Sequence, residues 1–347
     1  MPEPSVIHVA YPALVPVFDY ERVRALCPAT EVITAPYEIS HDQRTRRSHE
    51  PDNPELRALE PPLDPQLVAD LARAEILFTL DAPYDLALLA PRLRWIQALG
   101  SGVGQFASSG LDGTGIVLTN GAGIGSVPIA EWVLARVLSI AKRLDEHAEA
   151  QRRHQWEPRY GSMLQGRTMV IVGLGAIGRE VSRRARAFGV HVIGIRRSWA
   201  PGMSSPDADE LMGPGALHEA LGRADIIVVA APGSRENDGL FDAAAFATTK
   251  PGAIFVNVAR GSLVDEPALI AALESGQLRA AATDVARHEP LPPEDPLWNA
   301  PNLSISPHSS TSMEGYMERT FDQFFANLER YVDGRPLENV VDMTGGY

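Results

Sequence analysis

The sequence predicts an α/β protein built on parallel sheets. Short apolar runs alternate with helical patterns through the first third of the chain, and the alternation starts again at Met169. At that second start, an apolar strand leads through a glycine-rich turn into a helix. Strands that alternate with helices in this way pair in parallel, and the helices cover the sheet.

The first third contains five predicted strands, each an apolar run bounded by turn residues. They cover residues 5–11, 31–35, 74–80, 94–100 and 116–120. Helical patterns lie between them, for example DPQLVADLARA, which begins with an aspartate cap. The polar, proline-containing residues 41–62 are interpreted as a surface excursion, to which we assign no function.

The next segment, residues 127–151, shows one continuous helical pattern with Pro128 at its start. Its first half is apolar on nearly every side, which indicates burial against more than one surface. A domain connector and a subunit interface would both fit this pattern. The second strand–helix alternation ends at residues 303–308, and an amphipathic helix is predicted over residues 313–331.

Composition and charge exclude several classes of protein. The 347 residues are 45% hydrophobic and 22% charged, as in a globular chain. The 31 basic and 44 acidic side chains give a net charge of −13, without the basic footprint that nucleic acid binding needs. Cys27 is the one cysteine, the N-terminus lacks a signal-peptide pattern, and no apolar stretch has membrane-spanning length. We therefore expect a cytoplasmic protein without nucleic-acid or membrane partners, and the sequence indicates no metal site.

The glycine-rich turn GLGAIG directly follows the predicted strand TMVIV. In such a turn Gly173 allows the tight bend, Gly175 lets the backbone approach a pyrophosphate, and Gly178 lets helix and strand pack closely. The helix that follows offers free N–H groups and a positive dipole end, so Ala176 and Ile177 belong to the predicted site. The strand–turn–helix context predicts dinucleotide binding, which three glycines alone would not.

The tip of the next strand has the sequence GIRRS, which contains no carboxylate. NAD sites of this kind place an aspartate or glutamate there for the ribose hydroxyls. A guanidinium matches a phosphate dianion in charge and geometry. Arg196 and Arg197, with Ser198 as a further donor, are therefore predicted to hold the 2′-phosphate of NADP. The alternative is a solvated loop that binds NAD, with an arginine stacked on the adenine.

Several motifs in order resemble the D-isomer-specific 2-hydroxyacid dehydrogenase family over nearly the whole chain. They are GRTMVIVGLGAIGR, ADIIVVAAP, KPGAIFVNVARGSLVDEPALIAALESGQLRAAATDV and EPLPPEDPLWNAPNLSISPH. The resemblance implies two doubly wound, Rossmann-like domains, with the cofactor domain inserted into the substrate-binding domain. The expected boundaries are 1–122 and 310–347 for the substrate-binding domain, and 123–309 for the dinucleotide-binding domain. The helix at Pro128 resembles the family's dimer element, which implies a homodimer.

The resemblance also implies a catalytic set, and the residue types suit the chemistry. Reduction of a 2-oxo acid needs a cation for the carboxylate and ketone, a proton donor for the nascent alkoxide, and a hydride. Arg260 supplies a planar bidentate cation at a strand end, and His308 has the side chain of a reversible acid/base. Glu289 can pair with His308, orient the ring and favour its protonated form. A surface ion pair and a capping histidine are the alternatives for these residues.

The remaining implied residues lie in turns at strand ends. The turn ALGSGVGQF resembles the family's backbone nest for the substrate carboxylate, which maps to Ser101 and Gly102. Asp284 resembles the residue that faces the nicotinamide amide. The chain departs from the family pattern at Gly104, where an aspartate is usual, and at Ser310, which replaces a glycine. The other implied cofactor residues are Ala231, Pro232, Asn237 and Val258, and Ser310 is counted with them.

We therefore expect a reductase of small 2-oxo acids that prefers NADP(H), with NAD(H) as the alternative cofactor. Glyoxylate and hydroxypyruvate are the first candidate substrates. The formate dehydrogenase branch of the same superfamily carries glutamine in place of Glu289, which argues against that activity. Phosphoglycerate oxidation stays an alternative, although the chain ends soon after the tail helix. A nicotinamide-sensing partner protein of the same fold is the other alternative. Corepressors of this kind keep the residue set that corresponds to Arg260, Glu289 and His308.

Overall fold

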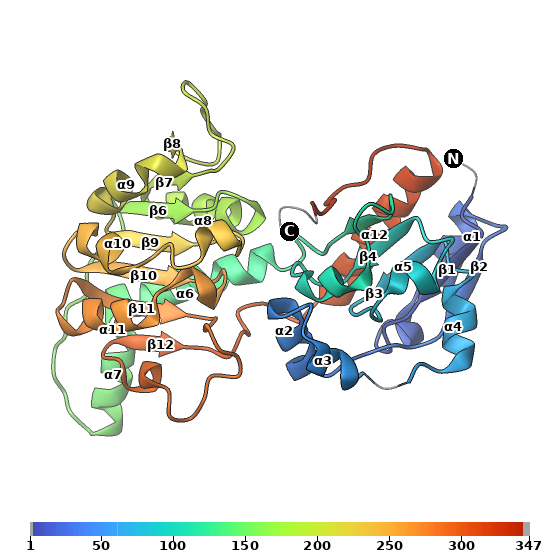
Figure 1. Ribbon diagram of the computed structural model, residues 1–347. Coiled ribbons are helices and arrows are strands. Elements are labelled where there is room, and N and C mark those ends of the chain that lie inside the picture. Colours follow the sequence, from blue (N-terminus) through green and yellow to red (C-terminus); the bar gives the residue numbers. More distant parts are fainter. Residues whose placement is uncertain (1–2, 61, 343–347) are drawn as a thin grey trace. The chain divides into compact units, whose positions relative to one another are not determined.

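The computed structural model describes residues 3–60 and 62–342. The chain divides into two compact units (Figure 1). Unit 1 comprises the residues up to Ile124 together with those from Met313 onward, and unit 2 runs from Gly125 to Ser312. Each unit contains one parallel sheet with flanking helices, so the predicted fold class is confirmed. The expected substrate-binding segments also include residues 1–2, 61 and 343–347, which lie outside the described residues.

Unit 1 contains a five-stranded sheet in the order β2-β1-β3-β4-β5, in which every pair is parallel. Its strands are β1 (Val6–Val9), β2 (Glu31–Thr34), β3 (Ile76–Thr79), β4 (Trp95–Ala98) and β5 (Val117–Thr119). Its helices are α1 (Tyr20–Leu26), α2 (His41–His49), α3 (Pro54–Ala58), α4 (Pro65–Leu71), α5 (Leu86–Leu89) and α12 (Tyr316–Val332). All five predicted strands are confirmed, each inside its apolar run.

The C-terminal helix α12 completes the core of unit 1. Its apolar side carries Phe324, whose ring stacks on Phe78 of β3 at 4.4 Å and on Trp95 of β4 at 5.5 Å between centroids. Such aromatic pairs add about 0.5–1.5 kcal/mol beyond the burial of their surface. The predicted amphipathic tail helix is confirmed, and this packing explains why the last segment of the chain belongs with the first.

The interpretation of residues 41–62 as a plain surface excursion is wrong, because helices α2 and α3 form there. Helix α2 starts at Ser40, whose side chain caps it. Arg44 of α2 makes a two-pronged ion pair of 2.6 Å with the buried Asp81, and Arg47 is only 2% exposed. A helix that is polar on all sides gives no apolar period to detect, so only these buried contacts reveal why it forms.

Unit 2 contains a seven-stranded parallel sheet in the order β12-β11-β10-β9-β6-β7-β8. Its strands are β6 (Thr168–Val172), β7 (His191–Ile195), β8 (Glu210–Met212), β9 (Ile226–Val229), β10 (Ala253–Asn257), β11 (Leu278–Thr283) and β12 (Leu303–Ile305). Strand β6 lies inside the sheet, with β7 and β8 on one side of it and β9 to β12 on the other. Such a switch point is where open α/β sheets bind ligands, outside the carboxyl ends of the strands.

Apolar side chains of the unit 2 sheet alternate between two cores. On β6, Met169 and Ile171 pack into one cluster with α6 and α8, while Val170 and Val172 pack into another with α9, α10 and α11. The helices are α6 (Ser126–Lys142), α7 (Leu144–Arg152), α8 (Ala176–Ala187), α9 (Leu217–Arg223), α10 (Ala243–Thr248) and α11 (Glu266–Glu274). The sheet is thus covered on both faces.

The single helix expected over residues 127–151 is wrong in one respect, because the chain forms two helices there. Arg143 adopts a left-handed conformation, with φ of 59°, and ends α6 before α7 begins. Helix α6 buries one side, including Ala130, Val133 and Val137, against the sheet, rather than all sides. Within the part of the chain that the structure describes, no helix has the length and apolar character needed to cross a bilayer.

Candidate active site

The predicted residues of unit 2 lie along one edge of its sheet. Because every strand is parallel, the turns that follow β6, β7, β9, β10, β11 and β12 all lie at the carboxyl edge. These turns, together with the first turn of α8, carry Gly173, Gly175, Ala176, Ile177, Gly178, Arg196, Arg197, Ser198, Ala231, Pro232, Asn237, Val258, Arg260, Asp284, Glu289, His308 and Ser310. The other two predicted residues, Ser101 and Gly102, follow β4 in unit 1.

The three glycines after β6 meet different surroundings. A Cβ on Gly173, whose φ is 99°, would lie 2.4 Å from the amide nitrogen of Ala231, and one on Gly178 would lie 2.1 Å from the carbonyl oxygen of Gly173. Packing within the protein therefore requires both of these glycines. A Cβ on Gly175 would meet no atom within 4 Å. The absence of a side chain at Gly175 leaves open space in front of the backbone.

Helix α8 begins at this open space, and no side chain caps its N-terminus. Its first N–H groups and its positive dipole end therefore suit an anion such as a pyrophosphate. In the loop after the neighbouring strand β9, the side-chain amide of Asn237 donates to the carbonyl of Pro232 at 3.2 Å. These features fit a dinucleotide.

The tip of β7 presents cations to solvent. The side chains of Arg196, Arg197 and Ser198 are exposed, and the backbone N–H of Arg196 is fixed by the carbonyl of Met212 at 3.0 Å. Among the described residues, no carboxylate forms an ion pair with Arg196. The backbone is held while the Arg196 guanidinium keeps its hydrogen-bonding capacity for an anion.

Glu289 and His308 form a hydrogen-bonded pair. The ring Nδ1 of His308 lies 2.8 Å from Oε2 of Glu289, and the N–H of Ala286 donates to Oε1 of Glu289 at 3.0 Å. Burial by itself raises the pKa of Glu289, but His308, the Ala286 N–H and the Arg260 cation outweigh it, and the pKa lies below its usual value. An ionised Glu289 fixes the ring through Nδ1 and leaves Nε2 for chemistry.

Arg260, which follows β10, is a half-buried cation. Its Nη1 donates to the carbonyl of Ala259 at 2.6 Å, and the side-chain amide of Asn257 donates to the carbonyl of Arg260 at 3.1 Å. Burial lowers the pKa of the Arg260 guanidinium, and the negative charge of Glu289 partly offsets this. Among the described residues, no carboxylate forms an ion pair with it. A cation held in this way is suited to an anionic or carbonyl group of a ligand.

Sequence reasoning missed the residue that brings the Arg260 and Glu289 loops together. A Cβ on Gly261 would lie 1.9 Å from the carbonyl carbon of Ala286, so the two backbones touch at this point. Gly261 is therefore required for the register between the loops, which no other residue type could keep. The sequence signal was the glycine directly after Arg260.

Asp284, which is 2% exposed, anchors the loop that carries His308. Its carboxylate accepts hydrogen bonds from the hydroxyl of Ser306 and from the N–H groups of Ser309 at 2.8 Å and Ser310 at 3.0 Å. Its backbone carbonyl accepts the N–H of His308 at 2.8 Å. The expectation that Asp284 faces the nicotinamide stays a prediction, while these bonds show a carboxylate engaged with the loop.

In unit 1, Ser101 and Gly102 form an exposed turn. The side-chain amide of Asn120 donates to the carbonyl of Ser101 at 2.9 Å and holds the turn in place. A Cβ on Gly104 would lie 2.8 Å from the Cβ of Ser48, which belongs to α2. A side chain at position 104 would therefore clash with α2.

Comparisons with known proteins agree with this arrangement. The model of the D-isomer specific 2-hydroxyacid dehydrogenase NAD binding domain matches residues 134–310. The chain is 34% identical over 264 residues to glyoxylate/hydroxypyruvate reductase B of Klebsiella pneumoniae, covering 73% of this chain and 80% of that protein. It is 32% identical over 302 residues to D-3-phosphoglycerate dehydrogenase of Mycobacterium leprae, covering 85% of this chain and 56% of that protein.

A solved structure is similar over the whole length. It is the NADPH-dependent glyoxylate/hydroxypyruvate reductase of Sinorhizobium meliloti in complex with NADP and sulfate, with a TM-score of 0.75 and 25% identity over 99% of this chain and 100% of that chain. The chain spans only about half the length of the phosphoglycerate dehydrogenase it matches. The family-model match and the relative that is 34% identical are nevertheless sufficient. The chain belongs to the D-isomer specific 2-hydroxyacid dehydrogenase family.

Proposed function

We propose that the protein reduces a small 2-oxo acid to the D-2-hydroxy acid with NADPH, and that glyoxylate and hydroxypyruvate are its substrate class. The observation that carries the proposal is the 2.8 Å pair of Glu289 and His308 next to Arg260, a cation without a carboxylate partner among the described residues. Proton donation and anion binding are the two functions that this reduction requires of a protein.

Each residue then has a defined role. Arg260 binds the carboxylate and carbonyl oxygens of the substrate, and the N–H groups of Ser101 and Gly102 bind the carboxylate. The cofactor, when bound, supplies a hydride to the carbonyl carbon. The protonated His308 gives its Nε2 proton to the oxygen that becomes the alkoxide, and Glu289 stabilises the charged ring until that transfer. In the reverse direction the neutral ring takes the proton from the hydroxyl group.

The cofactor is held along the carboxyl edge of the unit 2 sheet. The N-terminus of α8 receives the pyrophosphate, and Arg196, Arg197 and Ser198 receive the 2′-phosphate of NADP. The exposed cations after β7 support a preference for NADP(H), and NAD(H) is the alternative. The positions assigned to contact the cofactor are Gly173, Gly175, Ala176, Ile177, Gly178, Ala231, Pro232, Asn237, Val258, Asp284 and Ser310.

The test is a panel of 2-oxo acids assayed with NADPH and with NADH. We expect turnover of glyoxylate or hydroxypyruvate, with a higher kcat/KM for NADPH. Turnover of no 2-oxo acid by protein that binds NADPH would overturn the proposal and favour a nicotinamide-sensing partner protein. Chiral analysis of the product would decide the D configuration.

Phosphoglycerate oxidation is the second candidate. It is favoured by the 32% identity to the Mycobacterium leprae phosphoglycerate dehydrogenase over 85% of this chain. The two activities differ in the C3 substituent of the substrate, which carries a phosphate dianion in one case. Including 3-phosphohydroxypyruvate in the panel separates them, because a phosphate-binding enzyme would prefer it to hydroxypyruvate by orders of magnitude.

We also propose that the protein is a homodimer through α6 and the segment that follows it. Beyond α7, Trp156 is 100% exposed and Tyr160 is 86% exposed, and Val127 on α6 is exposed as well. Exposed large apolar side chains are typical of association sites. Sedimentation at micromolar concentration should give a dimer, and a Trp156→Ser variant should weaken it. A cytoplasmic location stays a prediction from the sequence.

A further inference from the structure

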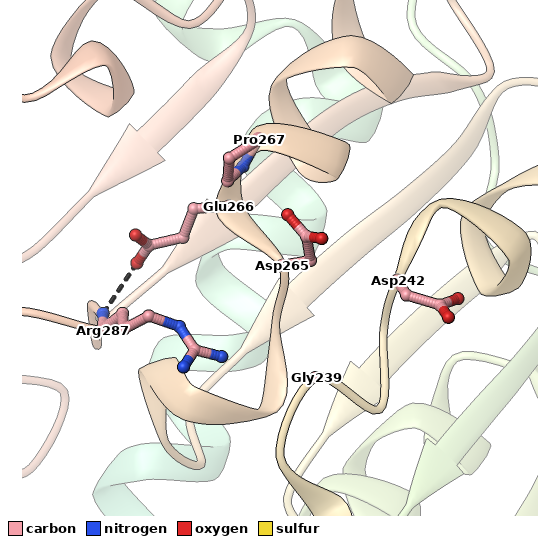
Figure 2. Close-up of a pocket in the computed structure, with 6 residues that line it drawn as sticks. All are labelled: Gly239, Asp242, Asp265, Glu266, Pro267 and Arg287. Atoms are coloured by element: carbon pink, nitrogen blue, oxygen red, sulfur yellow. Dashed lines mark hydrogen bonds between the residues drawn. The ribbon is translucent and has the colours of Figure 1, made fainter.

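A pocket of about 400 Å³ lies between the segments that carry Gly239, Glu266 and Arg287 (Figure 2). Its walls are formed by Gly239, Asp242, Asp265, Glu266, Pro267 and Arg287. The two aspartates are helix caps, because Asp242 accepts from the N–H of Ala245 and Asp265 from the N–H of Ala268. Glu266 and Arg287 have no such role, and both make contacts that lead toward the catalytic pair.

Glu266 holds the backbone of the Glu289 loop. Its Oε1 accepts the N–H of Arg287 at 2.7 Å, the bond drawn in Figure 2. The preceding N–H, that of Ala286, donates to Glu289 itself at 3.0 Å. Two successive N–H groups thus engage two carboxylates, one on the pocket side and one on the side of His308. The bond to Glu266 restricts the rotation of the peptide unit that carries the Arg287 N–H. The adjacent peptide unit carries the Ala286 N–H, which positions Glu289.

The Arg287 side chain joins this loop to two others. Its Nη2 donates to the carbonyl of Ser262 at 2.8 Å and lies 3.2 Å from Oδ1 of Asp238. Ser262 is two residues beyond Arg260, and Asp238 directly follows Asn237. In Figure 2 the guanidinium extends toward the pocket from the same residue whose N–H meets Glu266. One side chain therefore ties together three loops of the proposed active site.

We propose that Glu266 and Arg287 are positioning residues that clamp residues 285–289 from the pocket side and thereby fix the Glu289 carboxylate against His308. The inference rests on the proposed role of His308 as proton donor. Neither residue contacts the substrate or the cofactor in this scheme. Without the clamp, Glu289 spends less time at hydrogen-bonding distance from the ring and stabilises its protonated form less.

Loss of the clamp and loss of a charge would shift the His308 ring titration in opposite directions. Removing the Arg287 cation would, through charge alone, favour protonation of His308, so the titration of the ring would move to higher pH. Loss of the clamp moves it to lower pH, because the ring loses its carboxylate partner. The charged groups that face Glu289 are His308 and Arg260, and those that face Glu266 are Asp295, Arg287 and His288.

The experiment is an NMR titration of histidine-labelled protein, with the His308 signal assigned by its loss in His308→Ala. In Glu266→Ala and Arg287→Gln, we expect the midpoint of the ring titration to fall, by less than it falls in Glu289→Gln, where the charge itself is lost. In the same variants kcat should fall about tenfold, with a smaller change in KM, since small misplacements of catalytic groups cost rate.

Two further variants separate positioning from charge. Glu266→Gln keeps an oxygen acceptor for the Arg287 N–H and should restore the wild-type midpoint. Asp242→Asn removes a charge from the same pocket while retaining a helix cap, and should leave the midpoint unchanged. A rise of the midpoint in Arg287→Gln, or an equal shift in Glu266→Gln and Glu266→Ala, would overturn the clamp.

The titration is read in free protein and does not depend on turnover. A shift without turnover of any 2-oxo acid would support the clamp and contradict the proposed function. Normal turnover without a shift would contradict the clamp alone. If Glu266→Ala does not fold, Arg287→Gln still decides between the two explanations. The midpoint of the His308 titration falls if the clamp is lost and rises if only the charge matters.

Discussion

Two parts of the carboxyl edge of the unit 2 sheet are built differently, the loops after β10 to β12 and the tip of β7. At the β10–β12 end, Asp284 is 2% exposed and its carboxylate accepts N–H groups of the loop after β12. Arg260 is half-buried and donates to the carbonyl of Ala259 in its own loop. At the tip of β7, Arg196 and Arg197 are exposed, and the Arg196 backbone is tied to β8. The β10–β12 end therefore holds the Asp284 and Arg260 side chains by hydrogen bonds, while at the tip of β7 the hydrogen bond that holds Arg196 is made by its backbone.

The difference follows from the task proposed for each end. Proton transfer requires heavy atoms within hydrogen-bond reach, so small displacements cost rate. A phosphate dianion can be bound by flexible guanidinium groups from several directions. We therefore expect substitutions in the loops after β10 to β12 to cost activity. Substitutions at the β7 tip should instead alter the cofactor preference.

The largest effect is expected from His308→Ala, which removes the proposed proton donor at the fixed end. Turnover should fall about 10²–10⁴-fold, the usual contribution of general acid–base catalysis. The Kd for NADPH should stay nearly unchanged, since the ring does not hold the cofactor. Steady-state rates and a fluorescence titration measure the two quantities. A loss of less than threefold would remove His308 from the mechanism.

Next comes Arg196→Asp at the exposed tip. Loss of a phosphate–guanidinium contact, together with a repelling carboxylate, should raise the KM for NADPH on the order of 100-fold, and the KM for NADH far less. Replacing Arg197 as well should increase the discrimination. Kinetics with both cofactors measure it, and Arg179→Asp on α8 serves as a charge control. An unchanged NADPH to NADH ratio would show that the arginines have another role.

A smaller effect is expected from two glycines that follow β6, Gly175 at the N-cap of α8 and Gly178 in its first turn. Gly178→Ala places a Cβ 2.1 Å from a carbonyl oxygen and should destabilise the fold by roughly 2–3 kcal/mol. Gly175→Ala meets no protein atom within 4 Å, so the melting temperature should stay constant while NADPH binds about tenfold more weakly. Calorimetry and binding titration test the pair. Equal melting temperatures would contradict the packing requirement at Gly178.

The smallest effect is a pH shift in Glu289→Gln, which keeps the shape and removes the charge. Reduction needs the protonated His308, and the ionised carboxylate stabilises that form. The falling limb of the reduction rate should therefore move to lower pH. Oxidation needs the neutral ring, so its rising limb should move to lower pH as well. pH–rate profiles that do not move in Glu289→Gln would show that Glu289 and His308 do not act as a catalytic pair.

Motifs made most of the unit 2 site predictable. The glycine turn and the strand ends that carry Arg260 and His308 could be placed because each has a short sequence pattern in a parallel-sheet context. The residues that hold them could not. Glu266 and Arg287 act through contacts between loops 20 or more residues apart, and no local pattern records such contacts. The glycine at position 261 is visible in the sequence, but its contact with Ala286 is known only from the tertiary structure.

The sequence by itself determined the class of fold, the alternation of strands and helices, the dinucleotide turn and the types of residue available for chemistry. These depend on period, turn chemistry and side-chain type, which are local properties. Only the tertiary structure decided that α2 forms, that Arg143 divides the long helix, and that Glu289 meets His308 at 2.8 Å. Each of these depends on groups distant in sequence or on a backbone conformation that tertiary packing selects, as when Asp81 provides the partner that a polar helix needs.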